Sequence, residues 1–209
     1  PRSTPKPSSA ASDVYKRQVV DRSGIRGKSD GPGWDEVLVS AGGGAMGDQL
    51  LRTAMAAKPD SALADKIWRV LVGVKVPDKE FRALEKIASD DGGIIVERAR
   101  GDFPTLLMNC ALSISQGGYN TVMESMHAGA RSIVVPYAGG LETEQTLRAE
   151  RLAKQGAIVT LPEGQLTPAR LVVAIDGALA MTPTAPKVRT DGATDSATKI
   201  VAWAAALDW

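Results

Sequence analysis

The stretch QGGYNTVMES, residues 116–125, decides how the rest of this sequence is interpreted, because two glycines there join an apolar run to a helical pattern. The apolar run before it, residues 110–114, is typical of a buried strand. The pattern after it ends at Gly129, a residue type that commonly terminates helices. Backbone N–H groups and the helix dipole at such a turn favour an anion, usually a phosphate. Because Glu124 lies one helical turn further on, we expect a nucleotide whose ribose contacts that carboxylate.

Strand-like and helix-like segments alternate about six times along the chain with short connections, which predicts a parallel sheet covered on both faces. We therefore expect an α/β fold, a doubly wound, mostly parallel Rossmann-like sheet of about six strands. The predicted strands are residues 37–41, 68–76, 93–99, 111–115, 131–137 and 157–161. The predicted helices are residues 48–57, 78–90, 102–109, 121–128, 143–155, 167–180 and 195–209.

Three loops with unusual composition follow predicted strands. They are GGGAMG (residues 42–47), the glycine turn at 116–118, and AGGLETEQ (residues 138–145). Ligands of open α/β sheets bind beyond the carboxyl ends of the strands, so we expect these loops to meet at one edge. The charged residues of 146–155, by contrast, are expected to form a solvated helix face.

Composition changes along the chain predict four segments. Residues 1–18 have the composition of a disordered segment and resemble non-native, adapter-like sequence, so that the natural chain is expected to begin mid-protein near residue 19. Residues 19–35 are a predicted linker, residues 36–180 the α/β domain, and residues 181–209 an irregular segment followed by a helix.

Overall composition narrows the class of protein. Hydrophobic residues make up 44% and charged residues 23% of 209, and the net charge of +1 gives no reason to expect a nucleic-acid partner. No apolar run approaches the roughly 18 residues that span a bilayer, and no leader peptide is expected. The lone Cys110 fits a reducing compartment as a buried thiol, and His127 alone excludes a histidine-based metal cluster. We expect a cytoplasmic protein with no cofactor.

Each of the two glycine turns also has an interpretation that needs no phosphate. Thr121 and Glu124 have the spacing of a capping box, which would explain both without a nucleotide. GGGAMG satisfies the G-x-G-x-x-G pattern of dinucleotide sites, but no acid ends the second strand to hold a ribose. That loop is therefore interpreted either as a tight turn or as a close approach to another domain or a substrate.

From Gln116 to Gln145 the sequence resembles the donor-site signature of nucleotide-sugar glycosyltransferases of the B fold, specifically the glycosyltransferase family 28 C-terminal domain. The family pattern is His-Gly-Gly-x-Gly-Thr, then Glu, Gly, a strand ending in Pro, and an acid followed by Gln. The matching residues, over a resemblance that covers about 36–180, are Gln116, Gly117, Gly118, Thr121, Glu124, Gly129, Pro136, Glu144 and Gln145. This chain departs from the pattern with Gln116 for His and Asn120 for Gly.

The resemblance implies a role for each part of the signature. The donor diphosphate would lie against the turn and the helix start, formed by Gln116, Gly117, Gly118, Asn120 and Thr121. Glu124 would bind the ribose, Glu144 and Gln145 the donor sugar, and the loop with Gly43 and Gly44 would face the cleft. The expected reaction is transfer of a hexose or N-acetylhexosamine from a nucleoside diphosphate sugar, with UDP the family expectation, to an acceptor hydroxyl without a metal.

Family members place the acceptor site and the general base in an N-terminal domain, so no catalytic residue is assigned here. We expect this chain to be the donor-binding half, inactive without an N-terminal domain or partner chain. Two alternatives stay open: a non-catalytic nucleotide-sugar-binding subunit of a split enzyme, and a nucleotide-sugar 2-epimerase-like domain. A Rossmann oxidoreductase is disfavoured by the missing ribose acid.

Overall fold

The structure is a computed structural model of the 209-residue chain. It describes residues 31–41, 47–137, 143–182 and 192–206, with the backbone alone at 192–195 and 204–206. The predicted tail, residues 1–18, and residues 19–30 of the predicted linker lie outside these ranges.

Six parallel strands form one sheet in the order β3-β2-β1-β4-β5-β6. Its central strands are short, β-branched and buried on both sides, as expected where helices cover both faces. The strands are β1 (Val37–Ser40), β2 (Trp68–Val72), β3 (Ile94–Arg98), β4 (Leu112–Gln116), β5 (Ser132–Val135) and β6 (Val159–Thr160). This confirms the predicted α/β doubly wound fold.

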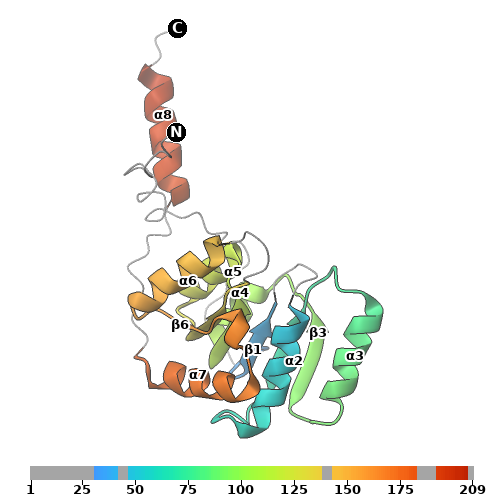
Figure 1. Cartoon of the computed structure of the whole chain (residues 1–209). Helices are drawn as coiled ribbons and strands as arrows, with labels where there is room; N and C mark the ends of the chain where they lie inside the picture. The colour runs from blue at the N-terminus through green and yellow to red at the C-terminus, as the bar shows by residue number, and fades with distance from the viewer. Residues whose placement is uncertain (1–30, 42–46, 138–142, 183–191, 207–209) are drawn as a thin grey trace, which may run out of the picture. The chain divides into compact units, whose positions relative to one another are not determined.

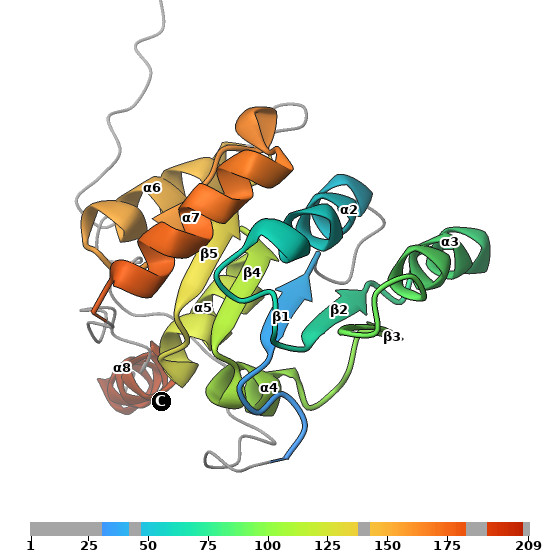
Figure 2. The same cartoon turned by 90° about the horizontal axis from the view of Figure 1, so that it is seen from below.

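Helices cover both faces of the sheet (Figures 1 and 2). Helices α2 (Asp48–Ala57), α3 (Asp78–Ala88) and α7 (Pro168–Ala180) lie on one face. Helices α4 (Phe103–Asn109) and α5 (Tyr119–Ala128) lie on the other, and α6 (Glu144–Lys154) packs against β6. Two short 3₁₀ turns, η1 (Lys58–Asp60) and η2 (Glu163–Gln165), complete the connections.

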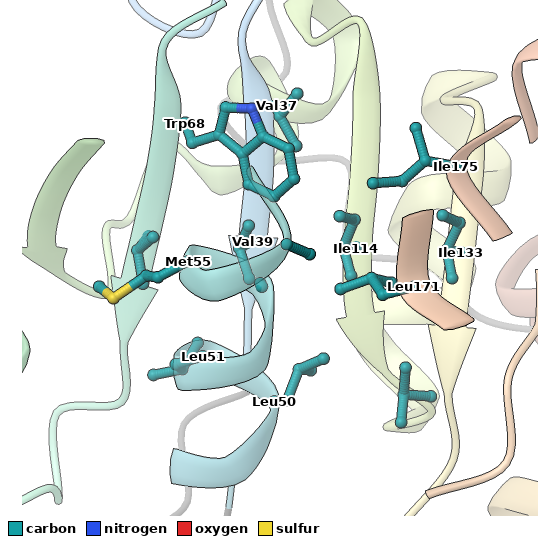
Figure 3. Close-up of a cluster of buried hydrophobic side chains, with 14 of the residues drawn as sticks. Val37, Val39, Leu50, Leu51, Met55, Trp68, Ile114, Ile133, Leu171 and Ile175 are labelled. Carbon is teal, nitrogen blue, oxygen red and sulfur yellow. The ribbon is translucent and has the colours of Figure 1, made fainter. Parts of the chain in front are cut away.

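The larger core lies between the sheet and the α2, α3 and α7 layer (Figure 3). Trp68 is completely buried there, and its indole N–H donates to the Leu63 carbonyl oxygen at 3.0 Å. That bond satisfies the polar group which burial of a tryptophan would otherwise leave unpaired. The other labelled side chains of this core are Val37, Val39, Leu50, Leu51, Met55, Ile114, Ile133, Leu171 and Ile175.

The order in which the chain adds strands to the sheet reverses between the neighbouring strands β1 and β4. From β1 it proceeds outward through β2 to β3, and it then returns to β4 and continues through β5 to β6. In sheets of this kind the crevice beyond the carboxyl ends of the two strands at the reversal is the usual ligand site. The loops after β1 and β4, which the sequence singled out, begin at this place.

Several predicted boundaries were wrong, each for a local reason. The second strand ends at Val72 rather than residue 76, because Gly73–Val76 forms a turn closed by a 3.0 Å bond from the Val76 amide to the Gly73 carbonyl. The fifth strand stops before Pro136, which has no N–H for the ladder. The sixth strand shrinks to two residues, and α5 begins at Tyr119 rather than Thr121.

Helix α8 (Gly192–Ala206) belongs to a separate compact unit from residues 23–186 and is described by itself. It begins three residues before the predicted start at Asp195, and the side chains of Ile200, Val201 and Trp203 are exposed. In the part of the chain that the structure describes, no helix is long and apolar enough to cross a membrane.

Candidate functional site

The β4–α5 turn presents the amino end of a helix. Gln116 is the last residue of β4, Gly117 is buried, and Gly118 precedes the first helical residue. The internal hydrogen-bond ladder of α5 starts with the Val122 amide, which donates to the Gly118 carbonyl at 3.0 Å. Gly118, the N-cap residue, has no side chain that could cap this end, and the first turn of α5 contains no acid. Such an end, with amides ahead of the ladder and a positive dipole, suits an anion.

The capping-box interpretation of Thr121 and Glu124 was wrong. The residue that caps α5 is Gly118, and Thr121 is already the third residue of the helix. The Thr121 carbonyl accepts a bond of 2.8 Å from the Ser125 hydroxyl, as ordinary helical backbone does. Glu124 is half-buried in the middle of α5, so its presence is not explained by capping.

The first glycine loop ends at Gly47, the residue before α2. Its φ of 130° is a backbone conformation that essentially only glycine adopts. A Cβ at this position would lie 2.3 Å from the Ala41 Cβ, so the close passage of β1 explains the third glycine of the pattern. The same Cβ would lie 3.4 Å from the Gln116 side-chain carbonyl carbon. The loops after β1 and β4 therefore do meet, while Gly43 and Gly44 lie outside the described residues.

The first turn of α6 lies against the glycine turn. A Cβ added to Gly117 would be 3.2 Å from both the Cβ and the Oε1 of Gln145, and 3.3 Å from the Pro136 Cα. That Oε1 accepts a 3.2 Å bond from the Tyr137 amide. The structure therefore brings Gln145 to the turn, as predicted from the common sheet edge. Thr143 precedes α6, but its side chain makes no capping bond.

Arg148 also lies against the glycine turn, although the charges of residues 146–155 were expected on a solvated face. Only 4% of Arg148 is exposed. Its Nη1 donates to the Gly117 carbonyl at 2.9 Å, and its Nη2 bonds the Glu144 carboxylate. Its guanidinium carbon lies 5.2 Å from the centre of the Tyr119 ring. The signal in the sequence was its spacing, because Arg148 falls one helical turn before the buried Leu152.

The remaining predicted residues take structural places. Met123 and Met126 are buried in the core, and His127 is exposed. Cys110 is half-buried, and its thiol donates to the Leu107 carbonyl at 3.3 Å. Within the ranges described above, no three His, Cys, Asp or Glu side chains gather as a metal site would need.

Residues 42–202 match the family described as glycosyltransferase family 28 C-terminal domain. The chain belongs to this family. A similar curated protein is the UDP-N-acetylglucosamine--N-acetylmuramyl-(pentapeptide) pyrophosphoryl-undecaprenol N-acetylglucosamine transferase of Rhodopseudomonas palustris (strain BisA53). The two are 34% identical over 123 residues, which are 58% of this chain and 33% of that protein. This member of family 28 thus spans about a third of the length of that relative.

Two solved structures share the fold of this family 28 domain. The calicheamicin glycosyltransferase CalG4 superposes with a TM-score of 0.60 and 19% identity, over 92% of this chain and 47% of its own. The UDP-GlcNAc 2-epimerase of Methanocaldococcus jannaschii superposes with a TM-score of 0.61 and 13% identity, over 81% of this chain and 46% of its own. At these identities the likeness establishes the B-type fold alone.

Proposed function

We propose that this chain is the donor-binding half of a glycosyltransferase that transfers a hexose or N-acetylhexosamine from a nucleoside diphosphate sugar to an acceptor hydroxyl. UDP is the nucleotide we propose, because the R. palustris relative is named for a UDP-sugar donor. The observation that carries the proposal is the meeting of the loops after β1, β4 and β5 at the point where the sheet order reverses. It is joined to the family 28 match over residues 42–202.

The diphosphate would lie against the amino end of α5, beyond Gly117 and Gly118. Two features support this place: the amides of Asn120 and Thr121 come before the helical ladder, and the first turn carries no acid that would repel a phosphate. As the bond from the sugar to the diphosphate breaks, negative charge grows on the departing phosphate. Amide dipoles already fixed in direction stabilise that charge more in the transition state than in the bound donor.

Glu124 would bind the ribose hydroxyls, and Glu144 with Gln145 would bind the donor sugar. Glu124 lies on α5 beyond the turn, at a position that capping does not explain. Gln145 lies against Gly117, and Glu144 precedes it at the start of α6. A nucleotide sugar extending from Glu124 past the turn to α6 would contact these residues in the order ribose, diphosphate, sugar.

The acceptor site and the general base are proposed to come from an N-terminal domain or a partner chain. The chain spans about a third of its R. palustris relative. Binding of the donor is therefore the activity that the 209 residues can be tested for directly. The 2-epimerase shares only the fold, and the family match favours transfer over epimerisation.

The test is calorimetric titration of the full chain with UDP, with GDP and NAD as comparators. A carboxylate that accepts ribose hydroxyls makes charged hydrogen bonds, so Glu124→Ala should weaken UDP binding by about 1.5–3 kcal/mol, about tenfold or more. Glu85→Ala is the matched control, because Glu85 is an exposed acid of a helix on the opposite face. UDP affinity equal in the two variants would remove Glu124 from the site. A folded chain that binds no UDP would reject the donor proposal.

A further inference from the structure

Arg148 is a buried cation that touches three parts of the proposed donor site. Its two terminal nitrogens donate to the Gly117 carbonyl, at 2.9 Å, and to the Glu144 carboxylate. Its guanidinium carbon lies 5.2 Å from the centre of the Tyr119 ring. The turn, the first residue of α5 and the first residue of α6 are therefore joined through one side chain.

Arg148 is not placed to contact a ligand itself. Only 4% of the residue is exposed, and its Nε is buried with no hydrogen-bond partner among the described residues. Burying a guanidinium is unfavourable unless its charge and its donors are matched by neighbours. The neighbours that match it here are two groups of the proposed site, so any effect of Arg148 on a donor passes through them.

The bond to Gly117 sets the direction of an amide. A trans peptide unit points its C=O and its N–H in opposite directions, and no cis peptide bond occurs among the described residues. When Arg148 holds the Gly117 carbonyl, the Gly118 amide is turned away from Arg148. The diphosphate is proposed at this turn, so that amide is one of its donors.

The bond to Glu144 holds an exposed carboxylate in one orientation. The Glu144 side chain is 60% exposed, whereas that of Arg148 is 4% exposed. A long exposed side chain normally samples several rotamers, and fixing them before binding lowers the entropy lost when the ligand arrives. Arg148 therefore orders Glu144 at the position where the donor sugar is proposed.

We propose that Arg148 is a positioning residue of the donor site, which orients the Gly118 amide for the diphosphate and the Glu144 carboxylate for the sugar. This inference rests on the proposed donor-binding function. Two acceptors held at once require the planar guanidinium fork, because a lysine ammonium is a single point charge on a flexible stem. Charge alone at this position is therefore not sufficient.

The test is calorimetry on the full chain with UDP and with UDP-N-acetylglucosamine as probes. Arg148→Ala and Arg148→Lys should each weaken both ligands by about tenfold, since neither variant holds the Gly117 carbonyl and the Glu144 carboxylate in their fixed orientations at once. Arg151→Ala, an exposed arginine of the same helix, is the matched control and should bind as the wild type does. Low millimolar guanidinium chloride should restore part of the affinity of Arg148→Ala by filling the vacated site. Sodium chloride at equal concentration should not.

The rescue separates loss of the guanidinium group at this site from a general loss of stability, because low millimolar guanidinium leaves the free energy of unfolding nearly unchanged. Urea unfolding of each variant shows that binding is measured on folded protein, and Arg148→Lys keeps the test valid if Arg148→Ala does not fold. Wild-type affinity in folded Arg148→Lys, or an Arg148→Ala defect that guanidinium leaves unchanged, would overturn the inference while the donor proposal stands. A wild-type chain that binds no UDP would overturn both.

Discussion

Gly117 and Gly118 are neighbours in one turn, but a methyl group added to each would meet different surroundings. At Gly117 it would press on the Gln145 side chain at 3.2 Å and on the Pro136 backbone at 3.3 Å. At Gly118 it would meet nothing within 4 Å, and φ there is −56°, which alanine adopts freely. The first glycine is needed for close packing, and the second leaves open space at the turn.

We therefore expect Gly117→Ala to lower the free energy of unfolding by about 1–3 kcal/mol, the usual cost of overpacking. Gly118→Ala should change it by less than about 0.5 kcal/mol, because the weaker helix cap is offset by a less flexible unfolded chain. Gly118→Ala should nevertheless weaken UDP binding, since its methyl group enters the space proposed for the diphosphate. Urea unfolding and calorimetry measure the two effects separately. Equal losses of stability in the two variants would contradict this account of the turn.

The burial of Arg148 could not be predicted from the residue types around it. Its neighbours in the helix, Glu150, Arg151 and Lys154, are exposed, and the pattern of charges correctly predicted a solvated face for them. The buried Arg148 donates to the Gly117 carbonyl, a backbone group 31 residues away. Because every residue has such a carbonyl, the residue types in the sequence do not reveal this contact. The placement of Gln145, in contrast, could be predicted because parallel strands bring their following loops to one edge.

At the scale of elements, the connection after α2 is tied to the turn that precedes β3 by a buried lysine. Lys58 is 6% exposed and donates to the Ala64 carbonyl at 2.8 Å and to Asp91 Oδ1 at 3.2 Å. The same carboxylate accepts a 2.9 Å bond from the Gly93 amide. That amide bond, and then the contact with Lys58, holds the pKa of Asp91 below its ordinary value of 3.8.

A carboxyl whose pKa is lowered by folding stabilises the folded state above its ordinary pKa. This contribution is lost as the pH falls through the lower pKa of the folded state. We expect the free energy of unfolding of the wild type to decrease below a pH of about 4, and Asp91→Asn to show a shallower decrease. The free energy of unfolding of Asp91→Asn should still fall somewhat with pH, because the hydrogen bonds from Arg100 also lower the pKa of Asp102.

Urea unfolding at a series of acidic pH values measures these slopes, with Asp90→Asn as the control because Asp90 is the exposed neighbour in the same turn. The control should follow the wild type. A slope of Asp91→Asn identical to that of the wild type would show that the tie between the α2 connection and the β3 turn contributes nothing at acid pH.

The predicted bounds of helices and strands were correct where the apolar periodicity is strong, and wrong where tertiary contacts determine the end of an element. Helices α2 and α7 each have an apolar stripe. Helix α7 also has an N-cap, because the Thr167 hydroxyl accepts a 3.3 Å hydrogen bond from the Arg170 amide. The predicted bounds of both helices agree with the structure to within one residue. The second strand was predicted to be too long, because Val74 continues the apolar pattern of the sequence. In the structure Val74 lies in a turn and is 64% exposed. Apolar residues alone do not show where a ladder ends.

At the scale of the whole molecule, the topology brings the predicted residues together. Three of the loops that follow strands were predicted to carry a site, yet β1 and β4 lie side by side only because the chain returns across the sheet after β3. The sequence separates Ser40 from Ser115 by a large part of the domain, while the register pairs them directly. Alternation of strands and helices predicted a sheet, and the loops after β1 and β4 meet at one edge of it as predicted.

Ligand binding at this edge should stabilise the whole domain, because the loops that meet there are anchored in the central strands β1, β4 and β5. UDP at 100 times its dissociation constant should add about 2.7 kcal/mol to the free energy of unfolding. For a domain of this size we expect the melting temperature to rise by roughly 5–10 °C. Far-UV circular dichroism, with and without UDP, measures the shift. At the same UDP concentration a tenfold weaker Glu124→Ala should gain only about half as much, or about 1.4 kcal/mol. An equal shift for the two proteins would mean that UDP stabilises the fold from a place other than the one built around Glu124.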